Sequence, residues 1–227
     1  MDFEIRLYLD QIGAKSPAHA LDRDVVRVMY VVDGALAVCK ENGTLGTLGA
    51  NSAIHQSGDW AISGGSVPTT VLRWEVVDAA RPTPLAALSD VSSTLLLAAP
   101  ALLRSDIEYL VRCDRVDFPP GGEALLHTHQ GCGTRCRVSG SSRIDTQGAS
   151  HVYGPLQAWF ENGTDPVFAA ADSQQPSAFV RVMILPRALL GGKSSIKYVR
   201  AEDLDRPKSQ RYQIFVDTPI ELPRQAA

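Results

Sequence analysis

A chain of 227 residues is long enough for one large domain or for two domains of roughly 100 residues each. Hydrophobic residues make up 44% of it and charged residues 21%, which is typical of a globular protein and excludes disorder over most of the length. Twenty-two lysines and arginines against 25 aspartates and glutamates give a net charge of −3, and no basic run is present, which excludes nucleic acid as a partner.

The N-terminal segment, MDFEIRLYLD, carries acidic residues where a signal peptide needs a basic region followed by an apolar one. The longest apolar run, at 94–103, is too short to span a bilayer and is interrupted by Pro100. We therefore expect a cytoplasmic protein that does not enter the membrane. Four irregularly spaced cysteines without a CxxC pair favour free thiols, most of them buried.

Short stretches rich in β-branched residues follow one another along the chain, and most of them end in Gly, Asn, Asp or Pro. In chain order, the predicted strands lie within 25–34, 35–43, 70–78, 109–122, 142–148, 178–185 and 212–222. Few segments have a helical period of useful length. The sequence therefore predicts an all-β protein.

The chain also repeats itself. Arg27–Gly34 can be aligned with Gly133–Gly140 at an offset of 106 residues, and each segment is an eight-residue strand candidate that ends in Gly. Gly49–Gly58 aligns with Gly154–Gly163 at an offset of 105 residues. Because the two offsets are nearly equal, the sequence predicts two equivalent β units.

We assign an N-terminal barrel to residues 1–88, a C-terminal barrel to 89–190 and a C-terminal extension to 191–227. A connector that contains Pro and Ala, at 80–88, joins the barrels, and strands at 70–76 and 179–185 close them. The extension has alternating apolar residues that need a partner surface, so we expect it to pack back on the barrels. Closing each sheet into a barrel would also remove exposed edges.

The second half resembles the cupin superfamily of small β-barrels. The first motif of that family is a Gly, five residues, His-x-His, three or four residues, a Glu, six residues and a Gly. Here Gly121 precedes His127 and His129 by the family spacing, and Gly140 is the final Gly. Counting back six residues from Gly140 places Gly133 where the family has its Glu.

The second cupin motif is also incomplete. Gly154 begins it, but Pro166 stands where the family has a third His. In the first half, Arg27 stands at the Glu position and Ala61 at the third His position. The resemblance covers about 15–78 and 108–187, and it implies a bicupin, that is, two tandem cupin barrels of the double-stranded β-helix or jelly-roll type.

His127 and His129 are the candidate metal ligands. Residues two apart in a strand face the same way, so both side chains are expected to face the barrel interior. Such a pair suits Fe, Mn, Ni, Cu or Zn, although tight binding needs at least one more protein donor. The candidates for this third ligand are Cys132, Gln130, His151 and Glu161. We expect one divalent transition metal in the C-terminal barrel and none in the N-terminal barrel; alternatively, the two histidines line a polar pocket without metal.

Arg135 and Arg137 share the inward parity of the first motif. Because a buried guanidinium group without an anion is costly, they suggest a small carboxylate or other oxyanion as ligand, with Arg135 the nearer donor. Alternatively, they reach solvent or pair with nearby acids. These acids are Asp145, Glu161 and Glu123.

Aromatic residues near the same end are expected to form an apolar wall of the pocket. They are Tyr153, Trp159 and Phe160. In the first half, His19, Arg27 and His55 are candidates for a second, metal-free pocket, with a local hydrogen bond as the alternative role of His55.

Three functions remain open from the sequence. The first is a metal-dependent enzyme of the dioxygenase, isomerase or lyase type that acts on a small organic acid, with Arg135 orienting the carboxylate. The second is a non-catalytic, metal-free bicupin that binds a small ligand or is structural. The third is a metal-free acid–base enzyme, which would need a His–Asp pair in the barrel. The resemblance also implies a homodimer.

Overall fold

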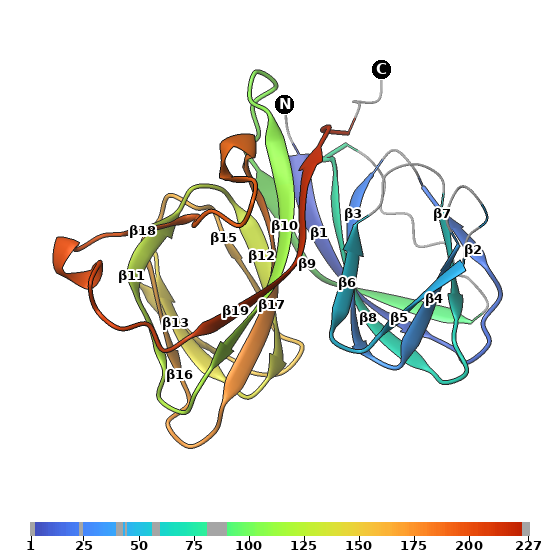
Figure 1. The fold of residues 1–227 in the computed structure, drawn as a ribbon, viewed down its shortest axis with the longest axis horizontal. Coiled ribbons are helices and arrows are strands. Elements are labelled where there is room, and N and C mark those ends of the chain that lie inside the picture. Colours follow the sequence, from blue (N-terminus) through green and yellow to red (C-terminus); the bar gives the residue numbers. More distant parts are fainter. Residues whose placement is uncertain are drawn as a thin grey trace. The chain divides into compact units, whose positions relative to one another are not determined.

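The computed structural model describes residues 3–22, 25–39, 43, 45–55, 60–80 and 90–223, and these are nearly all in strands or turns, as predicted. They form two compact units, of which the first comprises described residues of Met1–Asp106 and of Glu221–Ala227 and the second is Ile107–Ile220 (Figure 1). Within these residues, no helix is long and apolar enough to cross a membrane.

The first unit packs two antiparallel sheets against an apolar core. The larger sheet has the strand order β6-β3-β8-β1-β9 and the smaller one β2-β7-β4-β5. The strands are β1 (Phe3–Ile12), β2 (His19–Leu21), β3 (Val26–Asp33), β4 (Ala35–Cys39), β5 (Leu45–Gly49), β6 (Ser52–His55), β7 (Trp60–Gly64), β8 (Thr69–Asp78) and β9 (Val91–Ala101). Side chains from both sheets meet in the core, so the unit is a jelly-roll barrel.

The second unit repeats this topology. Its sheets have the orders β15-β12-β17-β10-β19 and β14-β13-β16-β11-β18. The strands are β10 (Tyr109–Phe118), β11 (Glu123–His129), β12 (Gly133–Ser139), β13 (Ser142–Thr146), β14 (Ala149–Tyr153), β15 (Ala158–Glu161), β16 (Val167–Ala171), β17 (Ser177–Pro186), β18 (Ile196–Tyr198) and β19 (Arg211–Ile220). Two short 3-10 helices, η1 (Arg187–Leu189) and η2 (Ala201–Asp203), flank β18.

Irregularities in the strand pairing repeat as well. The pairing of β1 with β9 shifts register between Leu7 and Tyr8, and that of β10 with β19 shifts between Cys113 and Asp114, 106 residues later in the chain. This offset equals the one found between the aligned sequence segments. The internal repeat is therefore a repeat of strand topology, and the two-barrel prediction is confirmed.

The division between the units differs from the predicted one. Residues 89–106 were assigned to the second barrel, but β9 pairs with β1 and belongs to the first. Residues 191–227 were assigned to an extension, but β18 pairs with β11 and β19 with β10, so most of this segment is part of the second barrel. In both barrels the first strand pairs with two strands, β1 with β8 and β9, and β10 with β17 and β19. The predicted boundaries separated β9 and β19 from these partners. Most of the predicted connector, 80–88, lies outside the described residues.

The apolar run at 94–103, which was not predicted as a strand, forms most of β9. Pro100 lies in β9 opposite Glu4, and Pro219 lies at the corresponding place of β19, opposite Leu110. Each of these strands is at the edge of its sheet. An edge strand can tolerate Pro because one side of its backbone has no partner strand that needs the missing N–H.

The interiors of the two barrels differ in one respect that bears on function. Met29 and Val31 of β3 belong to the apolar core of the first barrel. Met29 stands opposite an arginine of β8, and Arg135 of β12 stands opposite an arginine of β17. The second barrel thus places Arg135 and Arg137 where the first has Met29 and Val31. Only the second barrel has buried cations at these two positions.

Candidate functional site

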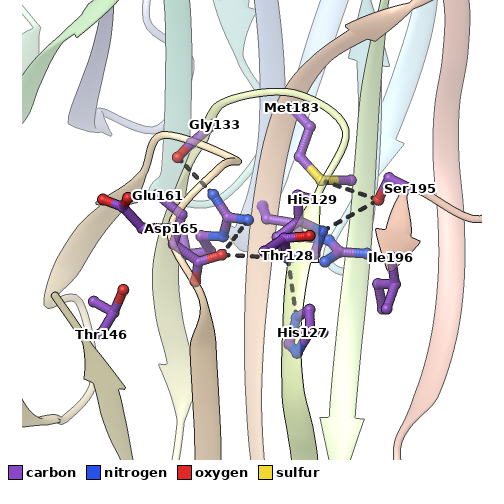
Figure 2. Close-up of polar contacts among 12 residues, drawn as sticks. His127, Thr128, His129, Gly133, Thr146, Glu161, Asp165, Met183, Ser195 and Ile196 are labelled. Carbon is purple, nitrogen blue, oxygen red and sulfur yellow. Dashed lines mark hydrogen bonds and ion pairs between the residues drawn. The ribbon is translucent and has the colours of Figure 1, made fainter. Parts of the chain in front are cut away.

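Two histidines lie side by side inside the second barrel. His127 and His129 extend from β11, and each is only 6% exposed. The Nδ1 of His127 donates to the carbonyl oxygen of Leu125 at 2.6 Å. The Nδ1 of His129 lies 3.3 Å from Ser195 Oγ, as Figure 2 shows. The two Nε2 atoms are 3.2 Å apart. Because a carbonyl oxygen only accepts, Nδ1 of His127 holds a proton, and Nε2 of the neutral ring carries a lone pair.

The carboxylate of Glu161, at the end of β15, completes this polar corner. Its Oε2 lies 3.3 Å from His129 Nε2 and 2.6 Å from Arg135 Nη2. Its Oε1 accepts a hydrogen bond from Trp159 Nε1 at 2.8 Å. Arg135 also donates through Nη1 to the carbonyl oxygen of Gly133 at 2.6 Å. Of the alternatives foreseen for Arg135, pairing with Glu161 is the one in the structure.

Burial and charge set the protonation of these groups. Burial lowers the pKa of His129 to about 3, and it also lowers the pKa of His127, so both rings are neutral near pH 7. Burial acts to raise the pKa of Glu161, but Arg135 outweighs it and holds that pKa well below its usual range. A proton on His129 Nε2 would therefore have two acceptors, the His127 lone pair and the Glu161 carboxylate.

A cavity lies beside these groups. The cavity has a volume of about 20 Å³, which is enough for one water molecule. Arg181 lines it and is held by Asp114 through two hydrogen bonds, of 2.7 Å from Nε and 3.1 Å from Nη2. Tyr212 of β19 also lines the cavity and is 44% exposed, which places it at the rim. The remaining lining residues are Val116, Phe118, Ala124, His127, His129, Arg135, Ile144, Trp159, Glu161, Val167, Ala169 and Phe179.

Solved structures share this architecture. A cupin 2 conserved barrel domain protein from Leptotrichia buccalis superposes with a TM-score of 0.50 at 10% identity, over 81% of this chain and 84% of that one. A single-residue variant of oxalate decarboxylase from B. subtilis superposes with a TM-score of 0.58 at 11% identity, over 78% and 68%. AerE from Microcystis aeruginosa gives 0.55 at 12% identity, over 81% and 87%. The chain has the cupin fold. No family model matches the sequence, and no curated protein matches it.

Within this fold, an acid from the neighbouring strand lies beside the histidines, where the first motif lacks its Glu. A Cβ atom on Gly133 would lie 2.3 Å from the carbonyl oxygen of Val182, so the backbone leaves no room for a side chain there. Glu161 is the cross-strand partner of Gly133 in the pairing of β12 with β15. Its carboxylate reaches the histidines from this adjacent position.

The other candidates for a third metal ligand lie elsewhere. Cys132 is buried, and burial raises the pKa of its thiol to about 11. The amide of Gln130 donates to the carbonyl oxygen of Ser194, and His151 is exposed. None of the three lines the cavity. Among the described residues, no group of three or more His, Cys, Asp or Glu side chains is arranged to hold a metal ion.

The two histidines alone do fit a transition metal. Donors about 2.1 Å from one ion lie roughly 3.0 to 3.4 Å apart for angles between octahedral and tetrahedral. The separation of 3.2 Å between the Nε2 atoms falls within this range. Glu161 is chemically suited as the third donor, but Arg135 occupies the oxygen that faces His129. The site therefore presents two imidazole nitrogens at a suitable spacing, which contact each other when no metal is bound, and a carboxylate that is already paired.

The predicted aromatic wall is present in part. Trp159 lines the cavity, and Tyr153 stacks on it with ring centroids 4.9 Å apart. Phe160 has the opposite strand parity and does not line the cavity. Arg137 does not line it either, although it is buried close by.

The corresponding part of the first barrel is filled by ion pairs. Arg27 pairs with Glu75 at 2.8 Å, and Glu75 also pairs with Arg73 at 2.7 Å. His19 bonds to the hydroxyl of Ser16 at 3.0 Å, and His55 to the backbone carbonyl of Arg27 at 2.8 Å. The candidates for a second pocket therefore make local contacts instead of facing a shared cavity.

Sequence reasoning missed three residues of the site. Arg181 was detectable in principle, because it is the single charge of the otherwise apolar β17, whereas Asp114 shares β10 with Arg112, Arg115 and Asp117 and did not stand out. Ser195 gave no signal, since it lies in the segment taken for an extension. It is only 2% exposed and contacts both His129 and Met183 (Figure 2).

Proposed function

We propose that the second barrel, whose cavity has room for one water molecule in this structure, widens to bind a small organic acid and that His127 moves a proton on it, in a reaction of the isomerase or lyase type. The observation that carries this proposal is the fixed tautomer of His127, whose Nδ1 donates to a backbone carbonyl while the ring stays neutral beside a cavity. A base held in this way has its lone pair on Nε2, and it accepts a substrate proton once its 3.2 Å contact with His129 Nε2 opens, with Glu161 left as the acceptor for His129.

The acid–base hypothesis needed a His–Asp pair, and in its place the structure has a glutamate, Glu161, beside His129. In the proposed step, a C–H bond of the substrate breaks, its electron pair stays on the substrate, and the proton bonds to His127 Nε2. The resulting imidazolium is stabilised by the nearby Glu161 charge. Return of the proton to another carbon gives an isomer, and departure of a leaving group gives an elimination.

The charges around the cavity favour this metal-free chemistry. Arg135 is balanced by Glu161, and Arg181 by Asp114, so the lining is close to neutral when both imidazoles are neutral. A divalent cation would add two positive charges to a buried site that has no further acid among the described residues. Burying uncompensated charge is costly.

Hydrogen exchange at carbon tests the proposal directly. Small 2-oxo and 2-hydroxy acids are incubated with the protein in D₂O, and the loss of their C–H signals is followed by NMR. We expect exchange with the wild type, its loss in His127→Gln, and its retention in the matched control His151→Gln, whose ring is exposed. Exchange that persists in His127→Gln would contradict the assigned role.

A second candidate function is the metal-dependent enzyme, which the Nε2 separation of 3.2 Å favours. His127 and His129 would hold the ion, with Glu161 as third ligand, and the metal would supply Lewis-acid polarisation of the substrate. Elemental analysis after reconstitution with Mn, Fe, Ni, Cu or Zn decides between the two. About one metal per chain, lost when His127→Ala is combined with His129→Ala, would favour the metalloenzyme, and well below one would favour proton transfer without metal.

The homodimer and the cytoplasmic location remain predictions from the sequence and its resemblance. Light scattering coupled to size-exclusion chromatography measures the first as a mass near twice the 24.5 kDa of the chain.

A further inference from the structure

Arg137 is a buried cation with an unused hydrogen-bonding edge. Its side chain is on β12, and the residue has 0% exposure. Nη1 donates to the hydroxyl of Ser177 at 3.3 Å, whereas Nε and Nη2 have no hydrogen-bond partner in the part of the chain that the structure describes. No carboxylate among these residues forms an ion pair with it, in contrast to Arg135 two residues earlier.

The surroundings stabilise the charge only in part. The guanidinium carbon lies 5.5 Å from the ring centroid of Trp159 and 5.3 Å from that of Phe179, so two aromatic rings contribute cation–π attraction. Burial lowers the pKa of Arg137 to about 10, which leaves it charged at neutral pH. A desolvated cation with two unsatisfied N–H groups still carries a substantial penalty.

Ser142 and Ser177 extend the polar character of this place. Their hydroxyl oxygens are 3.0 Å apart, and each residue is only 2% exposed. Ser177 Oγ accepts from Arg137 Nη1 and can donate to Ser142 Oγ, so the Ser142 hydroxyl and the Nε–Nη2 edge are the donors left for an oxyanion.

The protein shows what this edge binds elsewhere. Arg73 donates from Nε and Nη2 to the two carboxylate oxygens of Asp10, at 2.6 and 3.1 Å. Arg181 donates from the same two atoms to the two oxygens of Asp114, at 2.7 and 3.1 Å. In both cases the Nε–Nη2 edge holds one carboxylate bidentately. The free edge of Arg137 is of the same kind.

We propose that the Nε–Nη2 edge of Arg137 is the binding site for the carboxylate of a small organic acid, which enters when the side chains packed on this buried edge move aside, and that the Ser142 hydroxyl assists it. Trp159 and Phe179 contact this guanidinium and also line the cavity beside His127, which connects the two places. The identity of the rest of the ligand, a small organic acid, rests on the proposed function. The carboxylate site itself does not depend on proton transfer. It moves the recognition role from Arg135, which is paired, to Arg137.

Thermal unfolding in the presence of sodium formate or acetate tests the site, with sodium chloride at equal ionic strength as the reference. At about 100 times the dissociation constant, we expect the wild-type melting temperature to rise by roughly 5 to 10 °C. The rise should be absent in Arg137→Met, which keeps the volume and removes the donors. It should persist in Arg143→Met, a control at an exposed arginine of the same barrel.

Two further measurements separate the outcomes. Without carboxylate, Arg137→Met should melt at or above the wild-type temperature, because it removes an unpaired buried charge. A lower melting temperature together with no response of the wild type to formate would show a purely structural cation–π role and overturn the proposal, as would equal shifts in wild type and variant. A formate shift that survives in His127→Gln supports the carboxylate site even if the proton-transfer proposal fails.

Discussion

Replacing Arg135 by Met should destabilise the second barrel strongly, although methionine occupies the equivalent place in the first. Arg135 is 1% exposed, and its Nη2 lies 2.6 Å from Glu161 Oε2, whose side chain is 9% exposed. Arg135→Met leaves this carboxylate buried with only the Trp159 N–H and the neutral His129 beside it. Removing one partner of a buried ion pair costs about 3 to 5 kcal/mol, a large share of a typical unfolding free energy of about 5 to 15 kcal/mol.

The double variant shows whether the pair is the cause. Glu161→Gln keeps the shape and the acceptor for Trp159 but removes the charge, so Arg135→Met combined with Glu161→Gln leaves no buried ion. We expect the double variant to be more stable than the sum of the single effects predicts, by about 2 kcal/mol or more. Urea unfolding at pH 7 measures the four free energies. Arg143→Met, which breaks an exposed ion pair, should cost no more than about 1 kcal/mol.

Additive effects, equal within about 0.5 kcal/mol, would refute this reasoning. They would mean that Arg135 and Glu161 act independently and that the loss in Arg135→Met comes from packing.

Three further predictions concern backbone space, pH and thiol reactivity. Gly133→Ala should destabilise the barrel, because a Cβ atom there would lie 2.3 Å from a backbone oxygen. Gly133→Glu should destabilise it more and should not create a metal site. Urea unfolding measures the stability of both variants, and elemental analysis measures their metal content. Burial acts to raise the pKa of Glu75, but Arg73 and Arg27 outweigh burial and lower that pKa. The ionised Glu75 therefore stabilises the fold fully above about pH 4.3, and this contribution is lost as the pH falls further. Glu75→Gln should therefore lower the urea midpoint at pH 7 and lower it progressively less as the pH falls below about 4, whereas a pH-independent difference would contradict the assignment. Burial raises the pKa of Cys132 to about 11 and of Cys136 to about 12, so a thiol reagent should modify Cys39 in the native protein and the other three only in urea.

The sequence was sufficient for the fold because repeats and strand signals are local. The offset of 106 residues between Arg27 and Gly133 reappears between the register shifts of β1 and β10. The boundary between barrels was not predictable in the same way, because the partner of an edge strand is chosen by pairing across the sheet. The run at 94–103 has no alternation that marks it as a strand with one buried face.

Strand parity was sufficient to predict which side chains of the candidate site face the interior. His127 and His129 face the interior as their spacing requires. The partner of Arg135, by contrast, depends on which strand lies beside β12, and this placed Glu161 opposite Gly133. Sequence spacing predicted the same inward orientation for Arg135 and Arg137. In the structure, Arg135 forms an ion pair with Glu161, whereas Nε and Nη2 of Arg137 have no hydrogen-bond partner among the described residues.

The prolines of the two edge strands have a consequence for behaviour at high concentration. An open β edge is where chains add to one another in aggregates and domain-swapped forms, and a residue without an N–H interrupts that addition. Pro100 and Pro219 provide such an interruption at the same place in both repeats. Substituting both by valine, a good strand former with an N–H, should leave each barrel folded and make the protein more prone to self-association. We therefore expect protection against aggregation to have been duplicated together with the fold.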